Sequence, residues 1–365
     1  MNKSEALAKL PELLLQGKLS YDFDGIPLLA ERLGFKKRIN LIKTGINELF
    51  NFVRLRGLPP VVHLEPTNIC NLKCPLCPTG SQTLKRPKGF MSLETCRRVL
   101  DELGDTLMAA YFFSFGEPFM NKNLPEMIKS FSDRGILTIT STNGHHFQTM
   151  ADAMRIVNSG LKMMIIALDG STQNIYQAYR IGGDIEKVKR FATLIEEAKV
   201  RCNSAFPYTV ARCVVTSANK DDLPNIEKLA FNLGVNMFAT KSLGCLVGTD
   251  KYGAFEPSEK KWKRFEYARF SGKSKQSIQC IFPFRQPYVF WDGTVVGCEY
   301  DHDHEAAFGK IGEQRFKDLW NGPSALALRN GIRKNSNRPA FCRRCPFEGN
   351  VRRGTQLFCK ELRPL

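Results

Sequence analysis

Three cysteines, Cys70, Cys74 and Cys77, stand close together just after the apolar run at residues 61–64. Three thiolates at these spacings can bind three irons of a four-iron–four-sulfur cluster and leave the fourth iron open. An open iron can chelate a substrate, and a cluster with a tuned potential can donate an electron. A structural zinc site needs four protein ligands, and this short loop supplies no fourth, so zinc would need a distant partner.

A second set of four cysteines lies in the C-terminal third of the chain. Cys280 and Cys298 flank two apolar runs that are joined by an Asp-Gly turn at 292–293, which predicts a hairpin that brings the two thiols together. Cys342 and Cys345 follow as a CxxC pair. Four cysteines in two pairs can close a tetrahedral zinc site or hold an iron–sulfur cluster, and their spacing alone does not separate the two.

Apolar runs alternate with helical patterns between residues 59 and 240. The expected strands are 61–65, 109–115, 136–141, 161–168, 208–216 and 235–239. The expected helices are 92–103, 122–133, 147–158, 184–199 and 221–232, with Ser92 as a cap and Gly135, Gly160 and Gly234 as stops. Such strand–helix units predict a parallel α/β sheet with functional residues at the carboxyl ends of its strands. Six units are too few to infer a closed eightfold barrel.

Residues 1–58 are expected to be helical, and one segment carries an apolar stripe at three- and four-residue spacing. Lysines and arginines surround this stripe, so the helix could lie on an anionic membrane surface. A stripe of this kind more often packs against the neighbouring domain, and we expect packing here. The apolar stripe consists of Ile39, Ile42, Ile46, Leu49, Phe50 and Val53.

The composition limits the class of protein but does not identify the binding partner. With 365 residues, 43% of them hydrophobic, the chain can bury a large core and is expected to hold two domains. Its net charge of +17 suits phosphates, carboxylates, nucleic acid, an acidic redox donor or an anionic membrane. Because no apolar run approaches the length of a membrane span and no signal-peptide pattern opens the sequence, a cytoplasmic location is expected.

The CxxxCxxC at 70–77, placed after a first strand, resembles that of the radical S-adenosylmethionine (SAM) superfamily. Residues 114–118 resemble the family's Gly-Gly-Glu element, residues 141–144 its Thr-Asn-Gly turn, and residues 167–170 its Asp-Gly element. The resemblance implies a partial (β/α)6 barrel as the fold. It also implies that the open iron binds the amino and carboxylate groups of SAM, and that electron transfer to the sulfonium yields a 5′-deoxyadenosyl radical.

By the same resemblance, polar groups at the strand ends contact SAM. The backbone of the Gly-Glu element receives the amino group, and the side chains of Ser141, Asn143 and Asp169 meet the ribose or the amino group. Arg180 pairs with the carboxylate, for which its planar donor fork is suited. The alternative is that the Asn and Asp residues simply stabilise turns. The six predicted SAM contacts are Gly116, Glu117, Ser141, Asn143, Asp169 and Arg180.

The C-terminal cysteines resemble the SPASM/twitch extension of a radical SAM subgroup. The full SPASM pattern holds two auxiliary clusters and has more cysteines soon after the CxxC, whereas residues 346–354 contain none. The resemblance therefore implies the reduced, twitch-type form with one auxiliary [4Fe-4S] cluster. It leaves over Cys359, which we expect to be an unused thiol; the alternative is a remnant of the fuller pattern. The predicted ligands are Cys280, Cys298, Cys342 and Cys345.

These interpretations divide the chain into an N-terminal helical extension (1–58), a radical SAM core (59–255) and an auxiliary cluster domain (256–365). An auxiliary cluster with four cysteine ligands has no free iron for substrate, so electron transfer is its expected role. The alternative is a structural role, because a four-cysteine site also staples a small domain.

The leading functional hypothesis is a radical SAM enzyme that abstracts hydrogen and causes net oxidation or C–H modification of a small anionic, sugar or lipid-linked metabolite. A peptide-modifying enzyme is the alternative, and the reductant is expected to be a flavodoxin or ferredoxin. A non-catalytic metal protein that binds nucleic acid is a remote alternative, since the chain has no helix-turn-helix or finger spacing. Peripheral membrane association through the basic helix remains open.

Three histidines lie close to these motifs. His63 stands within an apolar strand and is expected to be a core residue. His145 and His146 follow the Asn-Gly turn and invite a metal or acid–base role, but adjacent loop histidines are more often turn or solvent-facing residues. No catalytic acid or base is assigned.

Overall fold

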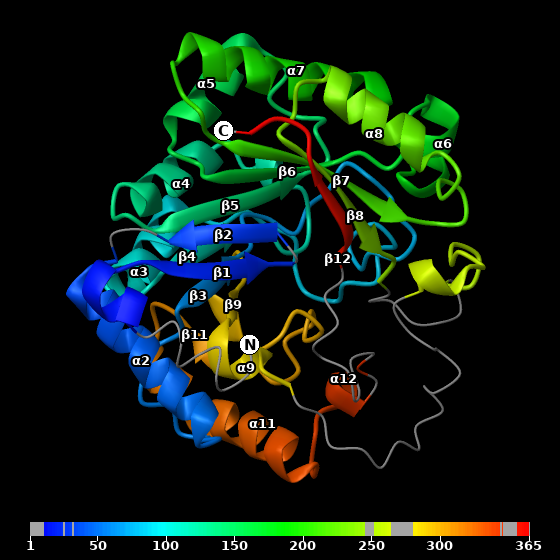
Figure 1. Ribbon diagram of the computed structural model, residues 1–365. Coiled ribbons are helices and arrows are strands. Elements are labelled where there is room, and N and C mark those ends of the chain that lie inside the picture. The colour runs from blue at the N-terminus through cyan, green and yellow to red at the C-terminus, as the bar shows by residue number, and fades with distance from the viewer. Residues whose placement is uncertain are drawn as a thin grey trace.

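The computed structural model describes residues 11–24, 26–30, 33–244, 252–263, 280–343, 345 and 356–364. Its centre is a ten-stranded sheet in the order β11-β10-β9-β3-β4-β5-β6-β7-β8-β12, whose middle strands β3 to β8 are parallel (Figure 1). β3 pairs with β9 and β8 with β12, so the six central strands do not close on themselves. The expected α/β fold with a partial barrel is confirmed.

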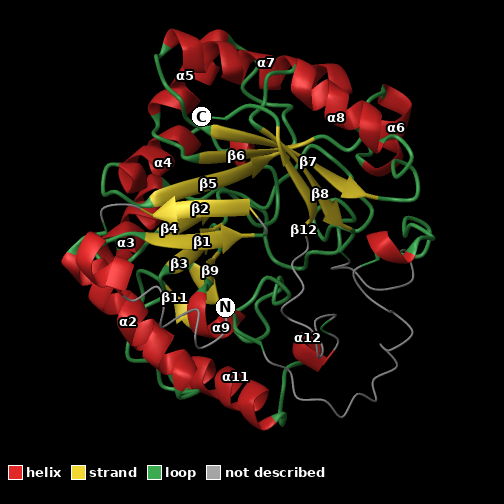
Figure 2. Cartoon of the chain, in the orientation of Figure 1, coloured by secondary structure: helices red, strands yellow, loops and turns green. Residues whose placement is uncertain are grey.

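The central strands fall where the apolar runs predict them. They are β3 (Val61–Leu64), β4 (Ala109–Phe112), β5 (Leu137–Thr142), β6 (Met163–Ala167), β7 (Tyr208–Val215) and β8 (Met237–Ser242). The helices around the outside of this curved sheet (Figure 2) are α3 (Leu93–Leu103), α4 (Leu124–Ser132), α5 (Met150–Asn158), α6 (Gln173–Tyr179), α7 (Ile185–Arg201) and α8 (Leu223–Asn232). Ser92 caps α3 as predicted, because its hydroxyl accepts the Thr95 N–H at 2.9 Å. Gly135, Gly160 and Gly234 have positive φ at the predicted helix stops.

The C-terminal segment extends the same sheet at both edges. The predicted hairpin is confirmed as β9 (Tyr288–Val289) and β10 (Thr294–Val296), and β9 lies parallel to β3. The last strand, β12 (Gln356–Glu361), pairs antiparallel with β8. The remaining elements are η3 (Lys260–Trp262), α9 (Phe282–Arg285), β11 (Gly309–Lys310), α10 (Phe316–Trp320), α11 (Pro323–Lys334) and α12 (Ala340–Arg343).

The inner face of the sheet is covered by an antiparallel hairpin, β1 (Leu19–Phe23) and β2 (Ile26–Ala30), which crosses in front of β3 to β5 in Figure 1. Phe23 and Ile26 belong to one buried cluster with inward side chains of the central strands such as Ile139. The expectation of an all-helical segment 1–58 was therefore wrong for these two strands. The Asp-Gly pair at 24–25 lies between two short segments, 19–23 and 26–30, that contain apolar residues. This pattern is a recognised hairpin signal, which the helical interpretation overlooked.

The tip of this hairpin is fixed by charge. Asp24 Oδ2 lies 3.1 Å from Arg212 Nη1 and 2.7 Å from Lys241 Nζ. Arg212 on β7 and Lys241 on β8 share the inner face with Val210 and Ala239, which pack in the inner cluster. Burial lowers the pKa of Arg212, and the neighbouring Asp24 carboxylate opposes this effect.

The N-terminal helix α2 (Phe35–Leu49) is preceded by a short π-helix, η1 (Glu12–Gln16). The face of α2 that is buried carries Lys37, Asn40, Thr44 and Asn47. None of the residues of the apolar stripe is buried. Five of its six residues are partly buried, and Ile42 packs against the inner cluster. The expectation that this stripe forms the packed face is therefore confirmed only for Ile42 and was wrong for the rest of the stripe. In the part of the chain that the structure describes, no helix has the length and apolarity that a bilayer crossing requires.

His63 is a core residue, as predicted. Its ring stacks on Tyr288 with 4.1 Å between centroids and meets Tyr111 edge-on at 4.7 Å. Burial lowers the pKa of His63 to about 3. A charged imidazolium is therefore strongly disfavoured inside this aromatic cluster.

We expect Asp24→Asn to lower the free energy of unfolding by roughly 2–3 kcal/mol, because it leaves the mostly buried Arg212 without its carboxylate partner. The matched control is Asp105→Asn, which breaks an exposed ion pair with Lys36 and should cost about 0–1 kcal/mol. Urea unfolding of both variants measures the difference. Equal losses would show that the hairpin tip contributes no more than a surface ion pair.

The low pKa of His63 predicts that the free energy of unfolding depends on pH. Its folded pKa of about 3 lies below the ordinary 6.5, so the unfolded chain binds a proton that the folded chain does not. The resulting stability is present above about pH 6.5 and is lost as the pH falls towards 3. Between pH 7 and pH 5, His63→Phe should lose about 2 kcal/mol less unfolding free energy than the wild type. Parallel pH profiles for the two proteins would contradict this assignment.

Candidate active site

The loop that follows β3 carries the first three cysteines at the carboxyl edge of the sheet. Cys74 is buried, whereas Cys70 and Cys77 are partly buried. The loop folds back on itself, since Cys77 N–H donates to the Cys74 carbonyl at 3.3 Å and Leu72 N–H points to Cys70 Sγ at 3.4 Å. The three thiols lie close enough to affect one another's pKa.

Two of the predicted SAM contacts lie against these thiols. Asn143 Nδ2 is 3.7 Å from Cys70 Sγ and also donates to Asn71 Oδ1 at 2.9 Å. Arg180 Nη1 is 3.7 Å from Cys74 Sγ. Burial raises the pKa of Cys70 to about 12, and it raises that of Cys74 against the opposing charge of Arg180. Iron binds thiolates, so a bound cluster would supply the positive charge that this buried site favours.

Asp169 and Arg180 form a pair that is aimed at the cysteine loop. Asp169 is fully buried, and its Oδ2 accepts from Arg180 Nε while its Oδ1 accepts the Val214 N–H at 2.7 Å. Both carboxylate oxygens are therefore engaged by the protein. This arrangement fixes the direction of the Arg180 guanidinium beside Cys74, which is what an anion-binding arginine needs.

Glu117 also uses its carboxylate inside the protein. The Thr142 hydroxyl and the Asn143 N–H each donate to it at 2.7 Å, and the Phe119 N–H donates at 3.2 Å. Burial raises the pKa of Glu117 to about 7, against these hydrogen bonds. The side chain therefore ties the turn after β5 to the loop after β4 and is not available for the predicted SAM contact.

Gly116 lets the loop after β4 approach the cysteine loop. Its φ is +78°, and a Cβ on this residue would lie 2.4 Å from the Thr67 carbonyl oxygen and 2.8 Å from that of Ile69. Glu117 N–H donates to the same Ile69 carbonyl at 2.8 Å. Only glycine fits this close approach without a backbone shift.

Ser141 and the two adjacent histidines take different places around this edge. Ser141 is partly buried and pairs in register with Ile165, so it lies on the inner face near the end of β5. His145 Nε2 accepts the Asp184 N–H at 2.7 Å, and its Nδ1 lies 2.8 Å from the Asn143 carbonyl. Both nitrogens of His145 are thus engaged by backbone, as in a turn residue. Burial lowers the pKa of His146.

The four cysteines of the second set lie near enough to affect one another's pKa. Cys280 precedes α9, Cys298 follows β10, and Cys342 lies in α12, with Cys345 N–H donating to the Cys342 carbonyl at 3.2 Å. Burial raises the pKa of Cys298, and the nearby Cys280 and Cys345 raise it further. Burial raises that of Cys342 to about 12, again with contributions from Cys280 and Cys345. Cys359 lies elsewhere, with its Sγ 3.3 Å from Met237 Sδ at the β8–β12 edge.

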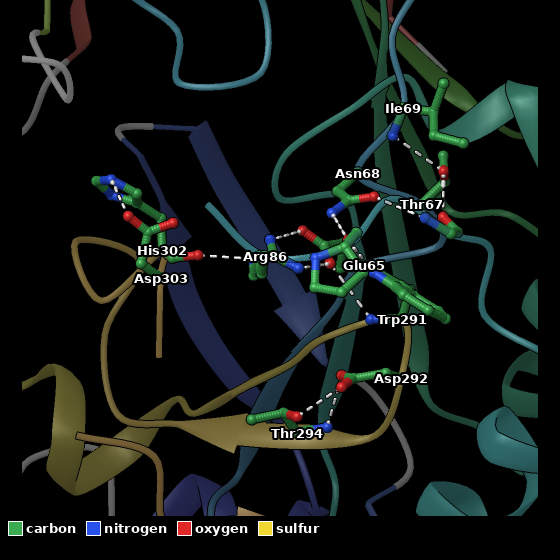
Figure 3. Close-up of polar contacts among 12 residues, drawn as sticks. Glu65, Thr67, Asn68, Ile69, Arg86, Trp291, Asp292, Thr294, His302 and Asp303 are labelled. Atoms are coloured by element: carbon green, nitrogen blue, oxygen red, sulfur yellow. Dashed lines mark hydrogen bonds and ion pairs between the residues drawn. The ribbon is translucent and has the colours of Figure 1, made fainter. Parts of the chain in front are cut away.

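A buried ion pair that the sequence analysis missed joins these two regions (Figure 3). Arg86 Nη1 and Nη2 donate to the two oxygens of Glu65 at 2.7 and 2.5 Å, and both side chains are almost fully buried. Arg86 Nε donates to the His302 carbonyl at 2.6 Å, and Trp291 N–H donates to Glu65 Oε2 at 3.2 Å. The guanidinium also lies 3.8 Å from the ring centre of Phe290. The pair therefore connects the cysteine loop to the segment around Cys298.

The donor sets fit the predicted clusters. Each set consists of thiols alone, which are the usual ligands of iron–sulfur clusters. Among the described residues, no three Cys, His, Asp or Glu side chains converge on a single metal ion. Thiolates of one cluster bind different irons, so they need not converge on one point.

Comparison with known proteins identifies the family. Residues 64–233 match the radical SAM superfamily model, and residues 280–346 match the SPASM iron–sulfur cluster-binding domain. The SPASM match spans all four auxiliary cysteines. The class of protein is thus a radical SAM enzyme. More particularly, this chain is a radical SAM enzyme with a C-terminal SPASM domain. Its cofactors are SAM, a [4Fe-4S] cluster and auxiliary iron–sulfur clusters.

Individual relatives match the chain at low sequence identity. The chain is 26% identical over 295 residues to a tungsten-containing aldehyde ferredoxin oxidoreductase cofactor-modifying protein of Pyrococcus furiosus, covering 71% of this chain and 80% of the relative. It is 32% identical to a PqqA peptide cyclase of Rhodopseudomonas palustris, covering 48% of this chain but only 45% of the relative.

Solved structures agree in fold. SuiB of Streptococcus suis bound to S-adenosylmethionine superposes with a TM-score of 0.63 at 12% identity, covering 95% of this chain and 83% of that one. The protein anSMEcpe with bound AdoMet superposes with a TM-score of 0.55 at 19% identity, covering 79% and 87%. At these identities the likeness establishes the fold alone.

We expect Gly116→Ala to lower the free energy of unfolding by roughly 2–4 kcal/mol, because its Cβ clashes with two carbonyl oxygens and its φ is positive. Iron bound after anaerobic reconstitution should fall by about half, because the displaced loop carries one of two cysteine sets. Gly135→Ala is the matched control, since Gly135 also has positive φ but no atom within 4 Å. Full iron binding by Gly116→Ala would show that the close approach does not shape the cysteine loop.

Proposed function

We propose that this enzyme removes a hydrogen atom from an anionic substrate and completes a net oxidation or another C–H modification of it. SAM bound to the first cluster supplies the 5′-deoxyadenosyl radical for this step. The observation that carries the proposal is that Arg180 contacts both Cys74 and Asp169, while Arg212 lies near enough for its pKa to respond to the charges of Asp169 and Arg180.

The residues of this site have separable roles in the proposal. Cys70, Cys74 and Cys77 hold the first cluster, and Arg180 receives the carboxylate of SAM. Asp169 acts as a positioning residue, because both of its oxygens are already bound by Arg180 and by the Val214 N–H. The remaining polar groups that face SAM are Gly116 and Glu117 through their backbone, Ser141 and Asn143.

The proposal that the substrate is an anion rests on two basic side chains, Arg212 and Lys241. Arg212 lies two residues before Val214 on β7, and its charge acts on both Asp169 and Arg180. Lys241 stands beside it on β8. Both now bind the Asp24 carboxylate of the β1–β2 hairpin. A carboxylate or phosphate of a sugar, lipid-linked or other small metabolite would meet the same cations in place of Asp24.

The second cysteine set fits a net oxidation of the substrate. After loss of a hydrogen atom, a substrate radical must lose one more electron to reach a closed-shell product. We propose that Cys280, Cys298, Cys342 and Cys345 hold one auxiliary [4Fe-4S] cluster, the type of centre that takes up one electron. The Glu65–Arg86 pair keeps the loop that carries Cys298 against the first cysteine loop.

A peptide is the second candidate substrate. PqqA peptide cyclases are among the relatives, and SuiB bound to its precursor peptide SuiA superposes with a TM-score of 0.60 at 13% identity, covering 90% of this chain and 78% of that one. In either case the electrons for SAM cleavage would come from a flavodoxin or ferredoxin in the cytoplasm. The basic surface suits such acidic donors.

The experiment is anaerobic reconstitution followed by iron counting and an assay of 5′-deoxyadenosine formed from SAM under reduction. The wild type should bind about eight irons, and the Cys70→Ala/Cys74→Ala/Cys77→Ala variant should bind about four and form no deoxyadenosine. Cys280→Ala/Cys298→Ala should also bind about four irons but still cleave SAM.

One control variant and two contradicting outcomes make the experiment decisive. Cys96→Ala removes a buried cysteine outside both sets and should keep both the iron content and the SAM cleavage of the wild type. Bound zinc, with no cleavage of SAM under strong reduction, would contradict the proposal. A Cys280→Ala/Cys298→Ala protein that retains about eight irons would contradict the auxiliary ligand assignment alone.

A further inference from the structure

The helix α2 presents its polar side to the protein and its apolar side outwards. Its buried residues Lys37, Asn40, Thr44 and Asn47 recur every three or four positions and so form one face. Phe35, Ile39, Ile46 and Phe50 recur with the same helical spacing on the other side, and none of them is buried. This is the reverse of an ordinary surface helix, whose apolar stripe faces the core.

The polar face is held by hydrogen bonds to backbone rather than by apolar packing. Lys37 Nζ donates to the Gly135 carbonyl at 2.9 Å, just after α4. Asn40 donates to the Leu58 carbonyl and accepts the Leu58 N–H, both at 2.9 Å. Asn47 Oδ1 accepts the Arg56 N–H at 3.0 Å. These bonds dock α2 against the segments that precede β3 and β5, and of the apolar stripe Ile42 packs against the inner cluster.

Large apolar side chains remain exposed along this surface. Phe35 at the start of α2 is 76% exposed, and Phe50 at its end is 68% exposed. Leu14 and Leu15 of η1 are 47% and 82% exposed, and η1 lies beside α2 because Arg38 Nη1 donates to the Leu14 carbonyl at 2.9 Å. Burying a Phe or Leu side chain stabilises by about 1.5–3 kcal/mol, so this surface favours an apolar partner.

The same segment is strongly basic. Residues 33–58 contain six lysines and arginines but only one acid, Glu48, which pairs with Arg285. Lys43, Arg54 and Arg56 are exposed, and the Arg56 guanidinium lies 4.8 Å from the ring centre of Phe52, which itself stacks on Phe50. Exposed aromatic and aliphatic residues rimmed by cations match the interface of an anionic bilayer.

We propose that η1 and the outward side of α2 form a docking surface for an anionic lipid bilayer. The charge decides between this partner and a second copy of the chain, because a twofold contact through the same surface would place the basic residues of both copies against each other. Anionic headgroups instead attract each exposed Lys or Arg near the surface. Figure 1 shows α2 along the outer edge of the molecule.

The test is co-sedimentation of the full-length protein with vesicles of phosphatidylcholine alone, or of phosphatidylcholine mixed with phosphatidylglycerol. The protein should bind the mixed vesicles, bind neutral vesicles far less, and lose binding as salt is raised. Phe35→Ser/Phe50→Ser should weaken binding by about tenfold or more, because two apolar anchors are lost. Lys43→Glu/Arg54→Glu should weaken it and reduce its salt dependence.

The matched control is Val200→Ser/Phe231→Ser, which removes two exposed apolar side chains from α7 and α8. This variant should bind vesicles like the wild type. Unchanged thermal unfolding of all variants shows that they are folded, which is expected for exposed positions. Absence of binding to anionic vesicles, or equal binding by Phe35→Ser/Phe50→Ser, would overturn the proposal. So would a dimer in sedimentation velocity that this variant converts to a monomer.

Discussion

The arrangement of the two cysteine regions depends on one buried ion pair, Glu65–Arg86. Both side chains lie almost entirely out of water, and all three nitrogens of the guanidinium donate hydrogen bonds. Breaking such a pair leaves a buried charge uncompensated, which typically costs about 3–5 kcal/mol. Glu65 directly follows β3, Arg86 lies beyond the cysteine loop, and Trp291 and His302 belong to the SPASM segment. A shift of any one of these parts alone would break a hydrogen bond to the buried pair.

Much of the fold could be predicted because it follows from local patterns. The strand–helix alternation, the Ser92 cap and the hairpin at β9–β10 each have a signal within a few residues. The cysteine sets are likewise visible as short spacings. The Glu65–Arg86 pair has no such signal, because its members lie 21 residues apart and their meeting depends on how the cysteine loop folds. The roles of Asp169 and Glu117 also depended on partners from distant strands and loops.

The two errors in the N-terminal segment have separate physical causes. The strands β1 and β2 are short, and their stability comes from covering an inner sheet face that no local rule anticipates. For α2, the apolar stripe was assumed to decide which side is buried. The polar side chains decided instead, since Lys37 and Asn40 satisfy backbone groups that neighbouring segments leave open.

The position of the β1–β2 hairpin constrains the order in which the protein can assemble. Asp24 is separated by 188 residues from Arg212 and by 217 from Lys241. Contacts of such long range slow folding, because a large loop must close before they form. During synthesis the hairpin emerges long before β7 and β8. Its apolar side chains therefore cannot be buried against those strands until the strands have been made. The inner face of the sheet is therefore covered late in folding, although the hairpin that covers it is translated early.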